Sequence, residues 1–185
     1  AGCRSGLLDL GDAPDGSNHS GLSMDAYPGI QALFPTVRDG STGLPVGPSH
    51  RITSKDSVLG VDVTGEQDAD QLPDDDGLTN ISPGTLASDR DGGDNGVQFP
   101  IYLPQCQITQ FGYTVTVATS TMDRFTNVWF DFNRNGSWGD QITCTHEGQV
   151  HTVSEWAVQN QLTSLAAGGH TAEGVTERLI GVVGA

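Results

Sequence analysis

The chain has 185 residues, which is enough for one β-domain with a sizeable core and short for two independent ones. Asp and Glu total 23 against 8 Lys and Arg, and the resulting net charge of −15 argues against a nucleic-acid partner, because phosphate binding needs clustered cations. No run approaches about 18 consecutive apolar residues, so the sequence predicts no transmembrane span.

The composition favours strands and turns. The chain has 25 glycines and 9 prolines, and helix-forming stretches are scarce. We therefore expect an all-β fold, specifically a β-sandwich of jelly-roll-like type with a loop-rich N-terminal half. The acidic excess has an ordinary explanation, a solubilising surface, and a sharper one, carboxylates neutralised by bound cations.

The first 20 residues are interpreted as an N-terminal arm ahead of a single domain over residues 21–185. The start of the arm contains Gly and Ser and has little apolar surface to bury by itself, so we expect it to need a docking partner. Addition of the arm as a strand to a neighbouring subunit would generate a head-to-tail fibre. The sequence therefore predicts a homo-oligomer or polymer.

Residues 1 to about 95 are rich in turns. Gly, Pro, Asp and Ser recur every few residues, as at residues 10–16, 27–29 and 38–40. So long a stretch without regular elements would normally indicate disorder, but scattered apolar residues such as Leu33 and Val61 oppose that interpretation. Bound metal ions are the simplest explanation of how such loops are held together.

Two acidic clusters lie in this half of the chain. Seven carboxylates between Asp62 and Asp76 would repel one another unless they are extended in solvent or folded around cations. Residues 89–96, D-R-D-G-G-D-N-G, have the style of calcium-binding loops in secreted proteins. The predicted calcium ligands here are Asp62, Glu66, Asp68, Asp70, Asp74, Asp75, Asp76, Asp89, Asp91 and Asp94, with Asp12 from the opening segment.

The second half of the chain alternates between apolar and polar residues. The clearest case is Tyr113, Val115 and Val117 alternating with threonines, the pattern of a half-buried strand. The predicted strands are residues 97–103, where Pro100 indicates an edge, 107–119, 127–132, 148–153 and 175–183.

One short helix is predicted, over residues 154–167. Ser154 suits its N-cap, and apolar residues from Trp156 to Leu165 give it a partial apolar face. Gly168 and Gly169 would end it.

Three cysteines, Cys3, Cys106 and Cys144, lie far apart and lack zinc-site spacing. Cys106 and Cys144 each lie next to a predicted strand end, so a disulfide between them is expected in an oxidising compartment. Cys3 would then be free, lipidated or bridged to another subunit. Weak support for glycosylation comes from the sequons at Asn18, Asn80 and Asn135.

Residues 131–140 form the strongest local motif. Oxygen-bearing side chains occupy positions 1, 3 and 5, and Gly136 follows at position 6, as in the first half of an EF-hand-like calcium loop. The usual acid at position 12 is replaced by Ile142, so an acid at position 10 would close a shortened loop. The same residues would also make an Asn-Gly hairpin turn. The predicted ligands are Asp131, Asn133, Asn135 and Asp140.

The motifs resemble, in order, those of the GEVED domain, a module of bacterial and archaeal surface and secreted proteins. Residues 10–15 resemble its G-D-A-P-D opening, and residues 59–70 resemble its L-G-x-x-V-D-x-E-x-D segment. Residues 128–142 resemble V-W-I-D-F-N-x-D-G-x-W-x-x-x-G-E-Q-I, although the loop is about three residues shorter and Asn135 replaces the usual Asp. The resemblance implies a surface-associated, calcium-type β-module and not a reaction.

No catalytic constellation is visible. The histidines are scattered and no nucleophile–base signature appears, so we expect no enzyme. The predicted function is that of a secreted or cell-surface structural or adhesive protein, stabilised by Ca²⁺ and self-assembling by N-terminal strand exchange. The alternative is a carbohydrate- or ligand-binding module of a larger secreted protein. Its candidate stacking residues are Tyr27, Trp129, Trp138 and Trp156.

Overall fold

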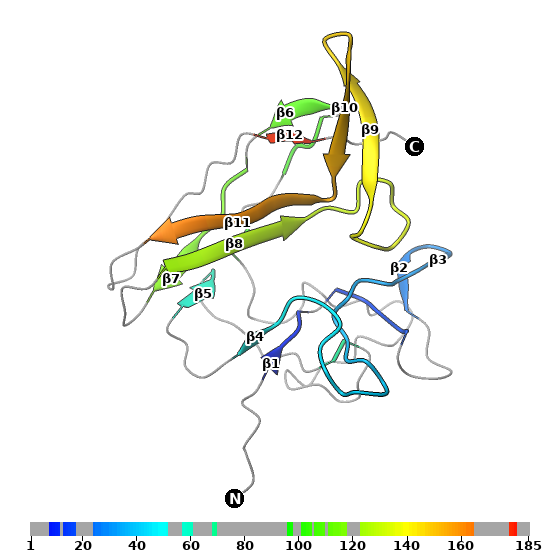
Figure 1. The fold of residues 1–185 in the computed structure, drawn as a ribbon, viewed down its shortest axis with the longest axis vertical. Helices are drawn as coiled ribbons and strands as arrows, with labels where there is room; N and C mark the ends of the chain where they lie inside the picture. The colour runs from blue at the N-terminus through cyan, green and yellow to red at the C-terminus, as the bar shows by residue number, and fades with distance from the viewer. Residues whose placement is uncertain are drawn as a thin grey trace, which may run out of the picture. The chain divides into compact units, whose positions relative to one another are not determined.

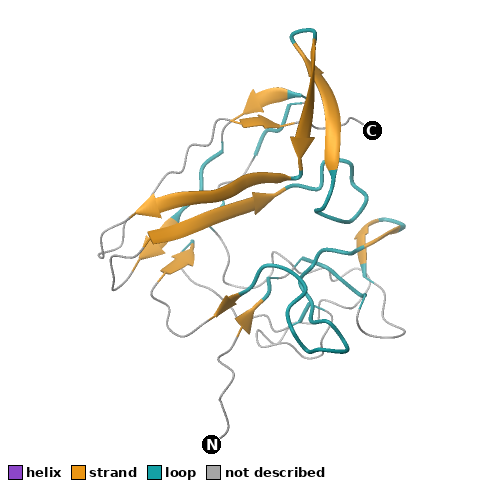
Figure 2. Cartoon of the chain, in the orientation of Figure 1, coloured by secondary structure: helices purple, strands orange, loops and turns teal. Residues whose placement is uncertain are grey.

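The structure is a computed structural model in which the described residues form strands and turns and contain no helix (Figures 1 and 2). The all-β prediction is therefore confirmed for this part of the chain. Accordingly, none of these residues belongs to a helix long and apolar enough to cross a membrane. The described residues are 8–11, 13–17, 24–51, 57–60, 68–69, 96–97, 101–104, 106–109, 111–117, 123–164 and 178–180.

The chain divides into two compact units. The first unit consists of residues 1–55, 63–94 and 135–137. The second unit consists of residues 56–62, 95–134 and 138–185.

The first unit has very short strands, because Gly and Pro interrupt the chain every few residues. β1 (Leu8–Asp9) pairs antiparallel with β4 (His50–Arg51), and β2 (Asp25–Tyr27) pairs antiparallel with β3 (Ile30–Gln31). Gly29 in the turn between β2 and β3 has a φ of +76°, which favours glycine. The buried apolar residues of this unit include Met24, Ala32, Phe34 and Val37.

The second unit has four antiparallel pairs, and two of them consist of strands of six to nine residues (Figure 1). The pairs are β5 (Ser57–Leu59) with β7 (Val115–Val117), β6 (Gln107–Thr109) with β12 (Arg178–Ile180), β8 (Asp123–Trp129) with β11 (Trp156–Ser164), and β9 (Gln141–His146) with β10 (Gln149–Ser154).

Two apolar clusters form the described core of this unit. Phe130 packs against both, and its ring lies 5.6 Å from Phe111 edge-on and 5.5 Å from Phe132. One cluster contains Cys106, Phe132, Ile142, Cys144, Val153 and Ala157. The other contains Phe111, Tyr113, Val115, Val117 and Val158.

The predicted alternation at residues 113–117 is confirmed. Tyr113, Val115 and Val117 are buried, while the threonines between them are half-buried. The predicted strand at residues 107–119 is nevertheless divided into β6 and β7 within its described part.

The remaining strand predictions differ in outcome. β10 covers residues 149–154, one residue later than predicted, and β12 lies inside the predicted range 175–183. β8 begins before residue 127 and ends at Trp129. Residues 101–104 form no strand, and Val97 makes a single bridge to Tyr113. Residues 98–100 lie outside the described part of the chain.

The prediction missed β9, although its sequence alternates. Ile142 and Cys144 are buried between exposed neighbours, and β9 joins β10 through a two-residue turn. Both turn residues, Glu147 (φ +49°) and Gly148 (φ +80°), have positive φ angles, as a type I′ hairpin turn requires.

The predicted helix at residues 154–167 is wrong over residues 154–164, which end β10 and form β11; residues 165–167 lie outside the described part. The register of β11 against β8 shifts twice, and Asn160 has a φ of +48°. These irregularities interrupt the two-residue alternation of the strand, so that Val158 and Leu162 lie four residues apart, which imitates a helical face. The predicted cap does accept a hydrogen bond, from the Trp156 backbone N–H to Ser154 Oγ (3.2 Å), but at the corner between two strands.

Candidate functional site

The loop of residues 131–140 connects β8 to β9. Its predicted third and tenth positions lie together, because Asn133 Nδ2 donates to Asp140 Oδ2 at 2.9 Å. The predicted first position, Asp131, is half-buried. The structure therefore brings two of the predicted ligands into direct contact within the second unit.

The tip of this loop, residues 135–137, belongs to the first unit. Asn135 Oδ1 accepts from the backbone N–H of Ser137 at 3.0 Å, and the Gly136 carbonyl accepts from the Leu33 backbone N–H at 2.8 Å. Gly136 has a φ of +86°, and a Cβ there would clash with the carbonyl oxygen of Gln31. Glycine is thus required at the sixth loop position, as the predicted tight turn demands.

Glu155 contacts the loop, although no sequence motif indicates it. Its side chain is fully buried at 0 % exposure, between β10 and β11. Glu155 Oε1 accepts from the backbone N–H of Phe132 at 3.1 Å, and Oε2 accepts from that of Asp140 at 3.0 Å. Both donors lie in or beside the loop. A Glu in the first turn of a predicted helix gives no signal of such a role.

The surroundings of Glu155 are electrostatically strained. Burial raises the pKa of its carboxyl, while backbone hydrogen bonds from Asp140 and Asn133 oppose that shift. The negative charges of Asp131 and Asp140 raise the pKa further. The charges of two loop carboxylates therefore act on the buried Glu155 carboxyl at the base of this loop.

The three tryptophans of the chain form one stack in the second unit. The Trp129 ring lies 5.9 Å from that of Trp138 and 5.6 Å from that of Trp156, at interplanar angles of 20° and 11°. Trp156 Nε1 donates to Asn127 Oδ1 at 3.0 Å. Trp129 thus stacks on both other tryptophans, and the stack joins the loop residue Trp138 to β8 and β11.

Buried carboxylates also occur in the first unit. Asp9, Asp15 and Asp68 are 7 %, 3 % and 4 % exposed. Asp68 Oδ2 accepts from the Arg38 backbone N–H at 3.3 Å. Burial raises the pKa of Asp15, hydrogen bonds from Ser17 lower it, and the charge of Asp68 raises it. Asp15 and Asp68 are thus close enough to repel each other.

The structure tests few of the other predicted ligands. Within the described part of the chain, no group of three or more His, Cys, Asp and Glu side chains lies together as a metal site would require. Calcium also takes Asn side-chain oxygens and backbone carbonyls as ligands. Outside the described residues lie Asp12, Asp62, Glu66, Asp70, Asp74, Asp75, Asp76, Asp89, Asp91 and Asp94, the sequon residues Asn18 and Asn80, and Cys3.

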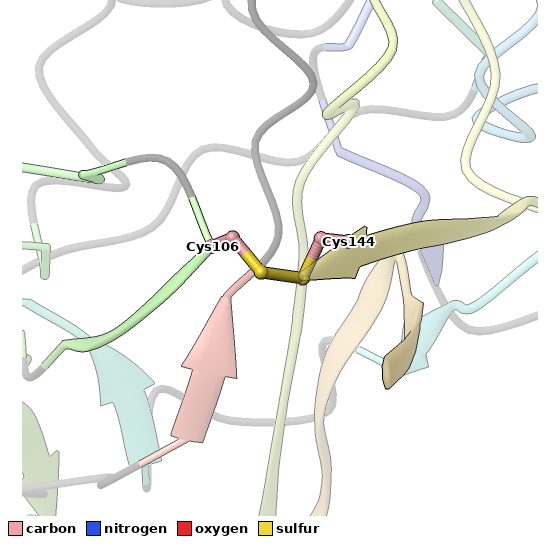
Figure 3. Close-up of a disulfide and its surroundings, with 2 residues drawn as sticks. All are labelled: Cys106 and Cys144. Atoms are coloured by element: carbon pink, nitrogen blue, oxygen red, sulfur yellow. A yellow bond between two sulfur atoms is a disulfide. The ribbon is translucent and has the colours of Figure 1, made fainter. Parts of the chain in front are cut away.

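The structure contains the predicted disulfide between Cys106 and Cys144 (Figure 3). Their Cα atoms are 5.7 Å apart, and both cysteines are buried in the apolar cluster around Phe132. The bond joins the residue before β6 to β9 across 38 positions of sequence.

Two of the histidines that look scattered in sequence meet on the β9–β10 hairpin. The rings of His146 and His151 are 6.3 Å apart and tilted. The register places them diagonally across the two strands, with His151 opposite Cys144.

Comparisons of the chain with protein-family models, with curated proteins and with solved structures found no match.

Proposed function

We propose that the protein is a secreted or cell-surface β-module with a structural or adhesive role, stabilised by bound calcium, and that it is not an enzyme. The observation that carries the calcium proposal is the contact between Asn133 and Asp140. The tenth residue of a shortened loop can complete an ion site only if its side chain lies close to that of the third residue. Here Asn133 Nδ2 and Asp140 Oδ2 are 2.9 Å apart.

The chemistry of the loop suits a hard cation. Calcium takes six to eight oxygen ligands, from carboxylates, amide and backbone carbonyls and water. Asp131, Asn133, Asn135 and Asp140 supply oxygens from one short segment. The net charge of −15 also favours a divalent cation over an anion as the bound species.

The extracellular proposal has separate support. The Cys106–Cys144 disulfide is of a kind that persists in oxidising compartments. The ordered resemblance to GEVED-domain motifs also points to surface and secreted proteins. We retain membership of that family, and a jelly-roll-like sandwich arrangement of the strands, as parts of the proposal.

Self-assembly by strand exchange would use pairings that the arm makes within its own chain. Leu8 pairs with Arg51 in the β1–β4 pair, and Asp15 bridges to Leu33. The Ala13 carbonyl accepts a hydrogen bond from the Thr36 hydroxyl. If the arm made these pairings with a neighbouring copy, each subunit would both give and receive one strand.

Calcium titration tests the first part of the proposal. Calcium at about 100 times its Kd should stabilise the native chain by about 2.7 kcal/mol relative to chelator, and raise the melting temperature accordingly. Asp140→Asn should weaken calcium binding, whereas Asp39→Asn makes the same charge change on an exposed turn and should not. Identical melting curves in calcium and chelator would refute the calcium proposal.

Electron microscopy tests assembly. Deletion of residues 1–20 should abolish fibres, and a peptide of residues 1–20 added to the truncated protein should bind it and restore its melting temperature. Fibres formed by the truncated protein would refute strand exchange.

Carbohydrate binding is the second candidate function. The outer faces of Trp138 and Trp156, at the two ends of the stack, are the ring faces that no other tryptophan covers. Binding to a glycan array that disappears on Trp138→Ala and persists in chelator would favour this candidate over a calcium-stabilised structural role.

A further inference from the structure

The loop of residues 131–140 is closed at its base by hydrogen bonds to one residue. The side chain of Glu155 accepts from Phe132 N–H and Asp140 N–H, at 3.1 Å and 3.0 Å. Its backbone repeats the connection, since Glu155 N–H donates to the Asp140 carbonyl at 3.0 Å and the Glu155 carbonyl accepts from Phe130 N–H at 2.9 Å. The chain entering the loop and the chain leaving it are thus both tied to Glu155.

The tryptophan stack is a second, independent connection. Trp129 lies at the end of β8, Trp138 lies in the loop, and Trp156 directly follows Glu155. The rings hold loop and strands together through apolar contact, whereas Glu155 does so through hydrogen bonds. Both connections are made by groups of the chain itself.

The missing acid at the twelfth loop position explains why such a connection is needed. In an EF-hand loop, the acid at that position closes the loop by binding the ion. Here Ile142 occupies the position; its side chain has no oxygen to bind an ion and is buried in the apolar cluster around Phe132. Glu155 closes the same end of the loop through the backbone N–H of Asp140.

We infer that Glu155 is a positioning residue that holds the 131–140 loop closed before any cation binds. The loop is then already organised when the ion arrives, and chelation empties it without opening it. The identity of the ion rests on the proposed calcium function, but the closure does not.

The complete burial of Glu155 separates this role from that of a direct ligand. Its two oxygens face backbone N–H groups of the loop, and the side chain is 0 % exposed. Gln at this position keeps the shape but has only one carbonyl oxygen, so it can accept from one of the two N–H groups and not from both.

Amide hydrogen exchange measured by NMR on the full, oxidised chain tests the inference. In wild type, the amides of Phe132 and Asp140 should stay protected in chelator. In Glu155→Gln, at least one of these amides should exchange about tenfold faster or more, because a buried N–H loses a charged acceptor. Glu147→Gln, on the exposed β9–β10 turn, makes the same charge change and should alter neither amide.

Amides of the β9–β10 ladder, such as that of Val153, serve as an internal reference. General destabilisation by Glu155→Gln would speed exchange at the reference and loop amides alike, which would overturn the positioning role. Rapid exchange of the Phe132 and Asp140 amides in chelated wild type, or loss there of the near-ultraviolet circular dichroism of the tryptophan stack, would also overturn it. The wild-type measurements stand even if the variant does not fold.

Calcium titration of the same samples keeps the two proposals apart. Absence of calcium binding by wild type would refute the proposed function and leave the closure standing. Calcium binding abolished by Glu155→Gln with unchanged loop amides would make Glu155 a direct ligand and refute the positioning role.

Discussion

The two units of this molecule organise their backbones in different ways. In the first unit the named strands are two or three residues long, and carboxylates accept hydrogen bonds from turn N–H groups: Asp9 from Gly11, Asp15 from Ser17 and Asp39 from Thr42. In the second unit, the β8–β11 and β9–β10 pairs have strands of six to nine residues, and a disulfide and two apolar clusters connect the strands. Turn-rich structure thus depends on side-chain acceptors, and laddered structure depends on apolar burial.

The second unit also uses a carboxylate as an acceptor for backbone N–H groups, at Glu155. A carboxylate there accepts from backbone N–H groups because the loop after β8 leaves the ladder. Whether a backbone N–H bonds to a side chain or to a neighbouring strand therefore depends on the local backbone geometry.

Loss of the disulfide should lower the free energy of unfolding more than any other change considered. The double substitution Cys106→Ala and Cys144→Ala should lower the free energy of unfolding by about 4 kcal/mol, because the bond closes a loop of 38 positions in the unfolded chain. Denaturant unfolding measures the change, with Cys3→Ala as the control. An effect below about 1 kcal/mol would show that the second unit does not depend on the cross-link.

Alanine substitutions at two glycines of the first unit compare the cost of backbone strain alone with that of strain plus steric crowding. Gly136→Ala should cost about 3 kcal/mol, because its φ is +86° and its Cβ would clash with the Gln31 carbonyl oxygen. Gly29 has a similar φ of +76° but open space where a Cβ would lie. Gly29→Ala should therefore cost only about 1 kcal/mol, from the backbone strain. Equal losses in thermal unfolding would show that crowding at Gly136 is relieved by movement of the loop tip.

Asn127 tests a side-chain acceptor inside the laddered unit. Its Oδ1 accepts from Trp156 Nε1 at 3.0 Å and from the Asn160 backbone N–H at 2.8 Å, beside the irregular part of β11. Asn127→Ala should cost about 1–2 kcal/mol, and Asn127→Asp, which keeps an acceptor, should cost less. If both variants unfold alike, the bulge is held by the strand pairing alone.

The smallest effect concerns acid titration of the exposed turn after Asp39. Its Oδ1 accepts from the hydroxyl and N–H groups of Ser41 and Thr42, which lower the pKa of Asp39 to about 2. Because the folded pKa lies below the ordinary value, the stabilising contribution is present above that ordinary value and is lost as the pH falls through about 2. Amide shifts of Ser41 and Thr42 followed by NMR should titrate near pH 2 in wild type and not in Asp39→Asn. A transition near pH 4 would contradict the turn geometry.

Features that depend on local pattern could be predicted from the sequence. The alternation from Tyr113 to Val117 predicts a strand that the structure contains, and β10 lies where residues 148–153 predict it. Turn chemistry at Gly136 predicts the positive φ of the 131–140 loop. Such features follow from steric preferences of neighbouring residues, so no distant contact is needed to specify them.

Features that join residues far apart in the sequence could not be predicted from local pattern. β11 is a strand and not a helix because β8 pairs with it. The register shifts in this pair interrupt the two-residue alternation by which a strand is predicted from sequence. Glu155 reaches Phe132 across 23 positions, and Asp68 accepts from Arg38 across 30. Periodicity carries no information about such partners, because a buried carboxylate is stabilised by whichever N–H groups the folded chain brings to it.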